Sequence, residues 1–152
     1  MRLTLSRLAL LWSLVFAAGL AGCNSVQPNK VKTTSDEKSV ELLMSGRMKG
    51  KALDVALKEA QKHPLGSAEN PVRADLNIGE HAYLNRLRCS DGVRPTYERP
   101  TTPGPGLYGS NVDTYDVLCA NGEPKHTVIV MDGFFPGYVE KKSVAGYTIE
   151  SP

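Results

Sequence analysis

The pattern of apolar and polar positions divides the chain into three parts. An apolar run from Leu8 to Leu20 follows a short basic start. Apolar residues then recur at helical spacing between residues 36 and 64, and after Pro71 they alternate with polar residues, which is typical of strands. The pattern therefore predicts a helical segment over residues 36–64 and a β-rich domain over residues 65–152.

One or two helices are expected in the helical segment, because Gly50 either separates two helices or marks a weak point within one. The first is predicted from Ser35 to Met48, because acidic residues follow Ser35 and suit the first turn of a helix. The second is predicted from Lys51 to His63, where four apolar residues form one stripe opposite the lysines: Leu53, Ala56, Leu57 and Ala60. A stripe of this kind packs against a core more often than against a partner, so core packing is the preferred interpretation.

About six strands are expected in the β-rich domain. We predict turns at residues 77–80, 90–92 and 121–122, and a strand over residues 82–89 with Tyr83, Leu87 and Cys89 on one face. Residues 127–131 form the most strand-like run, and the Pro/Gly-rich stretch from Pro100 to Gly109 is predicted to be a long loop. Helices followed by strands, without alternation, indicate an α+β fold: an N-terminal helix or helices, then a small, mainly antiparallel sheet or a partly closed barrel.

The N-terminus has the layout of a secretory signal peptide, with Arg2 and Arg7 before the apolar run. This run is too short for a membrane-spanning helix, which needs ~20 apolar residues. The sequence Leu20-Ala21-Gly22-Cys23 that ends it resembles the lipobox of bacterial lipoproteins. The resemblance implies cleavage of residues 1–22, acylation of Cys23 and a palmitate-type anchor in the bilayer, with residues 23–35 as a flexible tether.

The residue after the lipidated cysteine adds a location to this expectation. Asn24 resembles the outer-membrane class of lipoproteins, whereas an Asp at this position is typical of retention at the inner membrane. The resemblance therefore implies a lipid-anchored protein of the bacterial outer membrane that faces the periplasm.

The two remaining cysteines, Cys89 and Cys119, are expected to form one structural disulfide. They are an even pair in an oxidising compartment, and they are too far apart for a CxxC redox motif.

Charge excludes one class of partner. The chain has 18 basic and 16 acidic side chains, and the two arginines of the signal peptide account for the excess. The mature domain is therefore neutral, which argues against a nucleic-acid partner and against an electrostatic grip on anionic lipid.

No motif for catalysis or for a cofactor is recognised. The histidines lack a second ligand at metal-binding spacing, and no GxSxG motif or phosphate-binding loop is present. Carboxylate pairs such as Asp113 with Asp116, or Glu80 with Asp91, carry little weight, because sixteen acids in a small domain produce such pairs by chance. The sequence therefore predicts no enzyme, no catalytic residues, no metal and no cofactor.

Two loops that combine aromatic residues with Pro and Gly are the candidate partner-binding sites. They contribute Leu107, Tyr108, Phe134, Phe135 and Tyr138. Rigid aromatic loops make effective anchors for a partner, but the same rings can also fold back as a lid on the sheet. Both interpretations remain open at this point.

The segment Gly66–Gly109, which includes Ala-Tyr-Leu-Asn-Arg-Leu-Arg-Cys-Ser-Asp-Gly, resembles small bacterial envelope lipoproteins with no assigned activity. We expect a non-catalytic binding or structural module that assembles with an envelope protein. The alternatives are an inhibitor or immunity lipoprotein against a lysozyme-like or toxic enzyme, and an enzyme with an unrecognised site.

Overall fold

The computed structural model describes residues 45–100 and 103–152. It contains two helices and eight strands in this part of the chain. Their order is α2 (Gly50–Ala60), β1 (Val72–Asp75), α3 (Leu76–Arg86), β2 (Leu87–Arg88), β3 (Thr96–Glu98), β4 (Gly104–Pro105), β5 (Asn111–Leu118), β6 (His126–Asp132), β7 (Phe134–Val139) and β8 (Thr148–Ile149).

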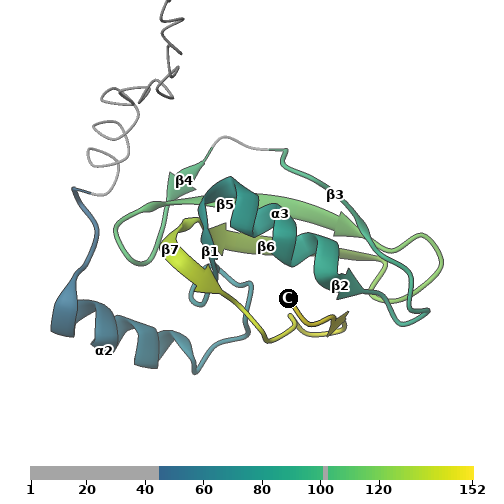
Figure 1. Ribbon diagram of the computed structural model, residues 1–152, viewed down its shortest axis with the longest axis horizontal. Helices are drawn as coiled ribbons and strands as arrows, with labels where there is room; N and C mark the ends of the chain where they lie inside the picture. Colours follow the sequence, from purple (N-terminus) through teal and green to yellow (C-terminus); the bar gives the residue numbers. More distant parts are fainter. Residues whose placement is uncertain (1–44, 101–102) are drawn as a thin grey trace, which may run out of the picture. The chain divides into compact units, whose positions relative to one another are not determined.

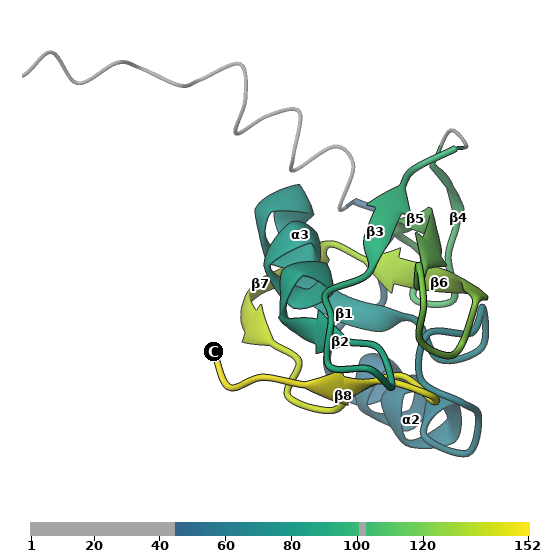
Figure 2. The same cartoon turned by 90° about the vertical axis from the view of Figure 1, so that its right-hand side faces the viewer.

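The main sheet is mixed and has the strand order β3-β5-β6-β1-β7, with β4 paired to β5. The pair of β1 and β6 is parallel, and the other pairs are antiparallel. β2 and β8 form a separate two-stranded sheet. The prediction of an α+β fold with a mostly antiparallel sheet is confirmed, and the sheet is open, with β3 and β7 at its edges (Figures 1 and 2).

The helix predicted from Lys51 to His63 is present as α2, but the prediction that the helices are N-terminal and precede all the strands was wrong. Neither helix is N-terminal: α2 begins at Gly50, and α3 lies between β1 and β2 in the chain. The helix predicted from Ser35 falls mainly outside the described residues. Residues 45–49, which end that prediction, are turn and extended backbone.

α3 replaces the predicted turn at 77–80 and most of the strand predicted over residues 82–89. Its buried residues are Glu80, Tyr83 and Leu84, which share one helical face. The helical spacing of these residues was not recognised because Glu80 is charged, and a charged residue is normally assigned to the solvent-facing side of a helix. α3 lies against the main sheet, in contact with β1, β6 and β7.

Most of the core lies between α3 and the sheet. Its largest buried side chains include Tyr83, Tyr115, Ile129 and Met131. The disulfide between Cys89 and Cys119, with its Cα atoms 6.0 Å apart, closes this core beyond the end of β5, as predicted.

A second, smaller core lies under α2. The apolar stripe of α2 packs against the buried rings of Tyr108 and Phe135, with Tyr138 beside them. The ring planes of Tyr108 and Phe135 meet edge to face, with their centroids 5.5 Å apart.

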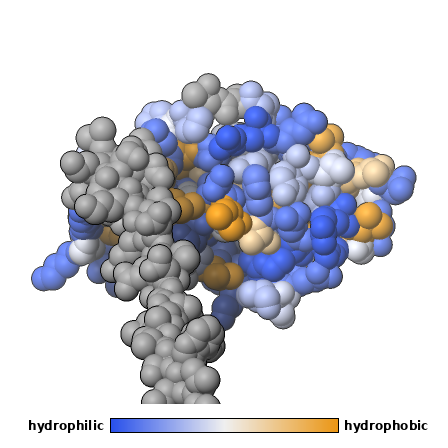
Figure 3. Space-filling view, turned by 45° about the horizontal axis from the view of Figure 1, so that its top comes forward, coloured by the Kyte–Doolittle hydropathy of each residue, from blue (hydrophilic) through white to orange (hydrophobic). Residues whose placement is uncertain are grey.

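The surface in Figure 3 is largely hydrophilic, with apolar groups scattered over it.

Candidate functional site

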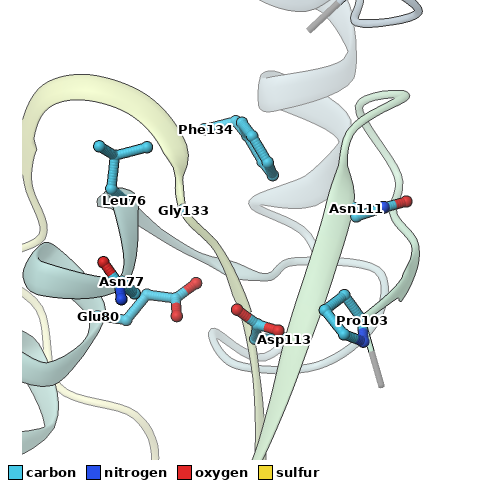
Figure 4. Close-up of a pocket in the computed structure, with 8 residues that line it drawn as sticks. All are labelled: Leu76, Asn77, Glu80, Pro103, Asn111, Asp113, Gly133 and Phe134. Carbon is cyan, nitrogen blue, oxygen red and sulfur yellow. The ribbon is translucent and has the colours of Figure 1, made fainter. Parts of the chain in front are cut away.

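A cavity of about 350 Å³ opens between α3, β5 and the connection from β6 to β7. Figure 4 shows two carboxyl groups that point toward one another across it, Glu80 from α3 and Asp113 from β5. The full lining is Leu76, Asn77, Glu80, Pro103, Asn111, Asp113, Gly133 and Phe134. Its volume falls in the range of small-ligand pockets, which is roughly 300–1,000 Å³.

Glu80 is the most deeply buried acid of this cavity, with only 1% of the residue exposed. The helical period of α3 directs it to the sheet together with Tyr83 and Leu84. The hydroxyl group of Tyr115 donates a hydrogen bond of 2.9 Å to its Oε2 atom. Glu80 is therefore held against β5 by one hydrogen bond from the sheet.

Asp113 faces the same cavity because it lies two residues before Tyr115 on β5, and residues two apart share a face of a strand. Its Oδ2 atom accepts a hydrogen bond of 3.1 Å from Nη1 of Arg99. Its Oδ1 atom is buried and accepts no hydrogen bond from an N–H or hydroxyl donor of the described residues. Asp113 thus keeps one oxygen atom that the carboxyl group of Glu80 or a donor from a ligand can engage.

Burial raises the pKa of Glu80 to about 7. The hydrogen bond from Tyr115 acts against this shift, while the charge of Asp113 and a hydrogen bond between the two carboxyl groups add to it. The positive charge of Arg99 lowers the pKa slightly. Near neutral pH Glu80 is therefore close to the midpoint of its titration, and its charge responds to whatever enters the cavity.

The backbone around the cavity is unusual at Leu76, the first residue of α3. Its φ of 54° lies in the left-handed region, which a branched residue rarely adopts. Its N–H group donates a hydrogen bond of 2.6 Å to the carbonyl oxygen of Gly133. A Cβ atom at Gly133 would lie 3.0 Å from Oε1 of Glu80, so a glycine here leaves room for the buried carboxyl group.

The cavity combines hydrogen-bond acceptors with apolar walls. The two carboxyl groups supply the acceptors, and Leu76, Pro103 and Phe134 supply hydrocarbon surface. Within residues 45–100 and 103–152, no group of three or more His, Cys, Asp or Glu side chains could hold a metal ion. The arrangement suits a donor-rich or positively charged group attached to an apolar stem.

The residues predicted to bind a partner separate into two sets. Tyr108 and Phe135 are only 1% and 8% exposed and belong to the core under α2. Tyr138 is half-buried beside them and donates a hydrogen bond to Glu140. Leu107 is 40% exposed, and the half-buried Phe134 lines the cavity. The lid interpretation therefore applies to Tyr108, whereas the predicted loop around Phe135 is in fact strand β7 of the sheet. Leu107 and Phe134 remain accessible.

The carboxyl pairs considered from sequence are not the pair that the fold assembles. Asp116 forms an ion pair with His126, at 2.9 Å from Nε2, and Asp91 accepts a hydrogen bond from the N–H group of Val93. Glu80 and Asp113 belong to elements far apart in sequence, so the sequence pattern gave no sign of their proximity. The only available signal was that Asp113 lies two residues before Tyr115, which places both side chains on the same face of the strand.

The predicted lipidation residue Cys23 lies outside the described residues. Among the residues that are described, no helix is long and apolar enough to cross a membrane.

Comparison of the chain with protein-family models, with curated proteins and with solved structures found no match. The function of this protein is therefore inferred from the residues of its own chain.

Proposed function

We propose that this protein is a lipid-anchored module of the bacterial envelope that acts by binding, without catalysis, through the cavity between α3 and β5. Two features support the proposal. The segment Leu20–Cys23 supports a lipid anchor, and Asn24 supports its placement in the outer membrane, facing the periplasm. The facing carboxyl groups of Glu80 and Asp113 support the cavity as the binding site.

The carboxyl pair is the observation that carries the proposal. Burying one carboxyl group beside another costs folding free energy, because each charge loses water and repels the other. Uncharged residues could fill the same space at lower cost. Groups with strongly shifted pKa values that line a cavity are therefore more common at functional sites than elsewhere.

The chemistry of the cavity favours a ligand with a primary ammonium group on an aliphatic stem. An ammonium group has three donors, and here it would find Oδ1 of Asp113 and the carboxyl group of Glu80. Its positive charge would favour the loss of the proton from Glu80. The stem would lie along Leu76 and Phe134. A small amine and a lysine side chain of a partner both carry this group.

A titration followed by NMR tests this assignment. The probe is n-butylammonium, with 1-butanol as a neutral analogue of the same length. We expect the amide signals of Asn77, Asn111 and Gly133 to shift with the amine and not with the alcohol. Glu80→Gln and Asp113→Asn should abolish the shifts.

The matched control is Asp116→Asn, which removes a carboxylate that pairs with His126 outside the cavity. This variant should keep the response to the amine. Equal shifts with amine and alcohol, or an unchanged response in Glu80→Gln, would refute the cation assignment. The affinity of a lysine-containing peptide is then compared with that of the free amine. Tighter binding of the peptide would indicate a partner protein, and tighter binding of the amine a small ligand.

The anchor is tested separately in cells that express the full chain. Metabolic labelling with palmitate should mark the wild type, and Cys23→Ser should lose both the label and the membrane fraction. Labelling that survives Cys23→Ser would contradict the lipoprotein assignment. The cavity titration does not depend on this outcome.

The same carboxyl pair favours one second candidate, which is acid–base catalysis. A carboxyl group with a pKa near neutrality that faces a second carboxyl group can act as an acid or a base. Reproducible turnover of an envelope substrate, lost in both Glu80→Gln and Asp113→Asn, would establish catalysis in place of binding alone.

A further inference from the structure

The charges of the described domain are unevenly distributed, although the domain as a whole is neutral. Residues 47–62, which include α2, contain five basic and two acidic side chains. The remainder of residues 45–152 contains eight basic and eleven acidic side chains. The region of α2 is therefore positive, while the rest of the domain is negative.

The positive charge of α2 faces away from the core. The apolar stripe of α2 packs on Tyr108 and Phe135. Residues at 100° intervals around a helix then place Lys51 and Lys58 on the opposite side, with the acid Asp54 beside Lys58, and Lys62 follows in the turn after the helix. All of these side chains are exposed. Among the ion pairs of the described residues, Lys62 pairs with Glu59, whereas Lys51 and Lys58 take part in none.

Apolar side chains accompany these lysines. Val55 lies on the same side of α2 and is 67% exposed. Met48 and Leu107, which are 38% and 40% exposed, line a shallow groove of about 750 Å³ beside the helix together with Val55. The surface thus presents lysines with exposed hydrocarbon groups between and beside them.

We propose that this outward face of α2, with Met48 and Leu107, docks on the surface of an anionic lipid bilayer. The lysine ammonium groups are complementary to anionic headgroups, and their long stems allow Val55 to approach the acyl boundary. Three lysines alone bind a membrane weakly, so this inference rests on the proposed anchor at Cys23. Anchoring makes docking intramolecular, and a weak surface then suffices to orient the domain.

The test uses the whole chain from Cys23 onward, with the Cys23 thiol coupled to a maleimide lipid in vesicles. This coupling does not require acylation in cells, so its result is independent of the lipoprotein assignment. The chain contains one tryptophan, Trp12, which lies before Cys23. Val55→Trp therefore introduces a single tryptophan that reports the environment of α2.

On vesicles that contain phosphatidylglycerol, we expect a blue shift of the Val55→Trp emission and quenching by brominated acyl chains. Phosphatidylcholine vesicles should give neither effect, and salt at about 0.5 M should reverse both. Val93→Trp is the matched control. Val93 is also exposed, at 56%, but it lies next to Cys89 of the disulfide and is not part of the α2 region. It should give no quenching.

A charge variant tests the role of the lysines in the Val55→Trp background. Lys51→Gln/Lys58→Gln/Lys62→Gln should lower the docking equilibrium by about a hundredfold, at roughly fivefold per lysine. Lys125→Gln/Lys141→Gln/Lys142→Gln, with the same change in charge elsewhere, should leave it unchanged. Quenching that is absent on anionic vesicles, or equal for the two charge variants, would overturn the proposal.

Discussion

The hydroxyl group of Tyr115 on β5 donates a hydrogen bond of 2.9 Å to the carboxyl group of Glu80 on α3. This contact joins the helix to the sheet at the floor of the cavity, where both residues are almost fully buried. The same carboxyl group of Glu80 faces Asp113 in the cavity. The stability of the fold and the chemistry of the candidate site therefore depend on the same side chains.

The pH dependence of stability tests the state of Glu80. Its pKa is about 7 in the folded protein, against a usual value of 4.5. Between these two values the folded protein keeps a proton that the unfolded chain has lost, so stability falls as pH rises from about 4.5 to 7 and then levels off. Glu80→Gln should remove up to about 3 kcal/mol of this loss.

The measurement is urea unfolding of wild type and Glu80→Gln at several pH values. The buried Asp132 also has a raised pKa and gives a slope of the same sign, so the difference between the two proteins isolates Glu80. The exposed Glu98 supplies the control, because Glu98→Gln should keep the wild-type slope. A difference curve for Glu80→Gln that is flat with pH would contradict the assigned pKa.

The hydrogen bond from Tyr115 is tested by Tyr115→Phe. Without the donor, the buried Glu80 carboxyl group loses a partner, and we expect a loss of about 1–3 kcal/mol in the free energy of unfolding. The pKa of Glu80 should rise further, because the hydrogen bond favours its charged form. Tyr97→Phe should cost less, since the 3.3 Å hydrogen bond from Tyr97 to Asn85 is exposed.

The disulfide should contribute substantially to stability. It joins residues 30 positions apart, and closing a loop of this length restricts the unfolded chain. Cys89→Ala/Cys119→Ala is expected to lower the free energy of unfolding by about 3–4 kcal/mol, measured by urea unfolding without reductant. Reductant should lower the stability of the wild type and leave that of the variant unchanged. A loss well below 1 kcal/mol would show that the bridge constrains little.

The adjacent residues Leu107 and Tyr108 give a prediction that separates a surface position from a core position. Tyr108→Ala should destabilise the protein by about 3–5 kcal/mol, because it empties a position that is 99% buried under α2. Leu107→Ala, at the adjacent exposed position, should change stability by less than about 0.5 kcal/mol. Thermal unfolding of both variants measures this difference, and equal effects would contradict the placement of Tyr108 in the core.

Several elements were predictable because their sequence pattern and their burial agree. The apolar stripe of α2 repeats at helical spacing and is the face that packs on the core. Tyr115 and Val117 alternate on β5 and are both buried, and the even pair Cys89 and Cys119 forms the bridge. In each case local periodicity or residue count carried the information.

α3 and the carboxyl pair were not predictable in this way. α3 begins directly after β1 at a left-handed Leu76 without a side-chain cap, so the usual signals of a helix start are missing. Its buried Glu80 interrupts the apolar stripe. The partner Asp113 is brought to Glu80 only when α3 packs on the sheet, and no local pattern records that packing.

The central claim is that the cavity between α3 and β5 is the site at which this protein binds its partner or ligand. The most direct measurement is photo-crosslinking in cells that express the full chain, with benzoylphenylalanine in place of Asn77 at the cavity rim. If the cavity binds a partner or ligand, we expect an adduct of defined mass that disappears when Glu80→Gln is added. The same probe in place of the exposed Val93 should give no such adduct. An adduct at Asn77 that is indifferent to Glu80→Gln, or no adduct at Asn77, would contradict this claim.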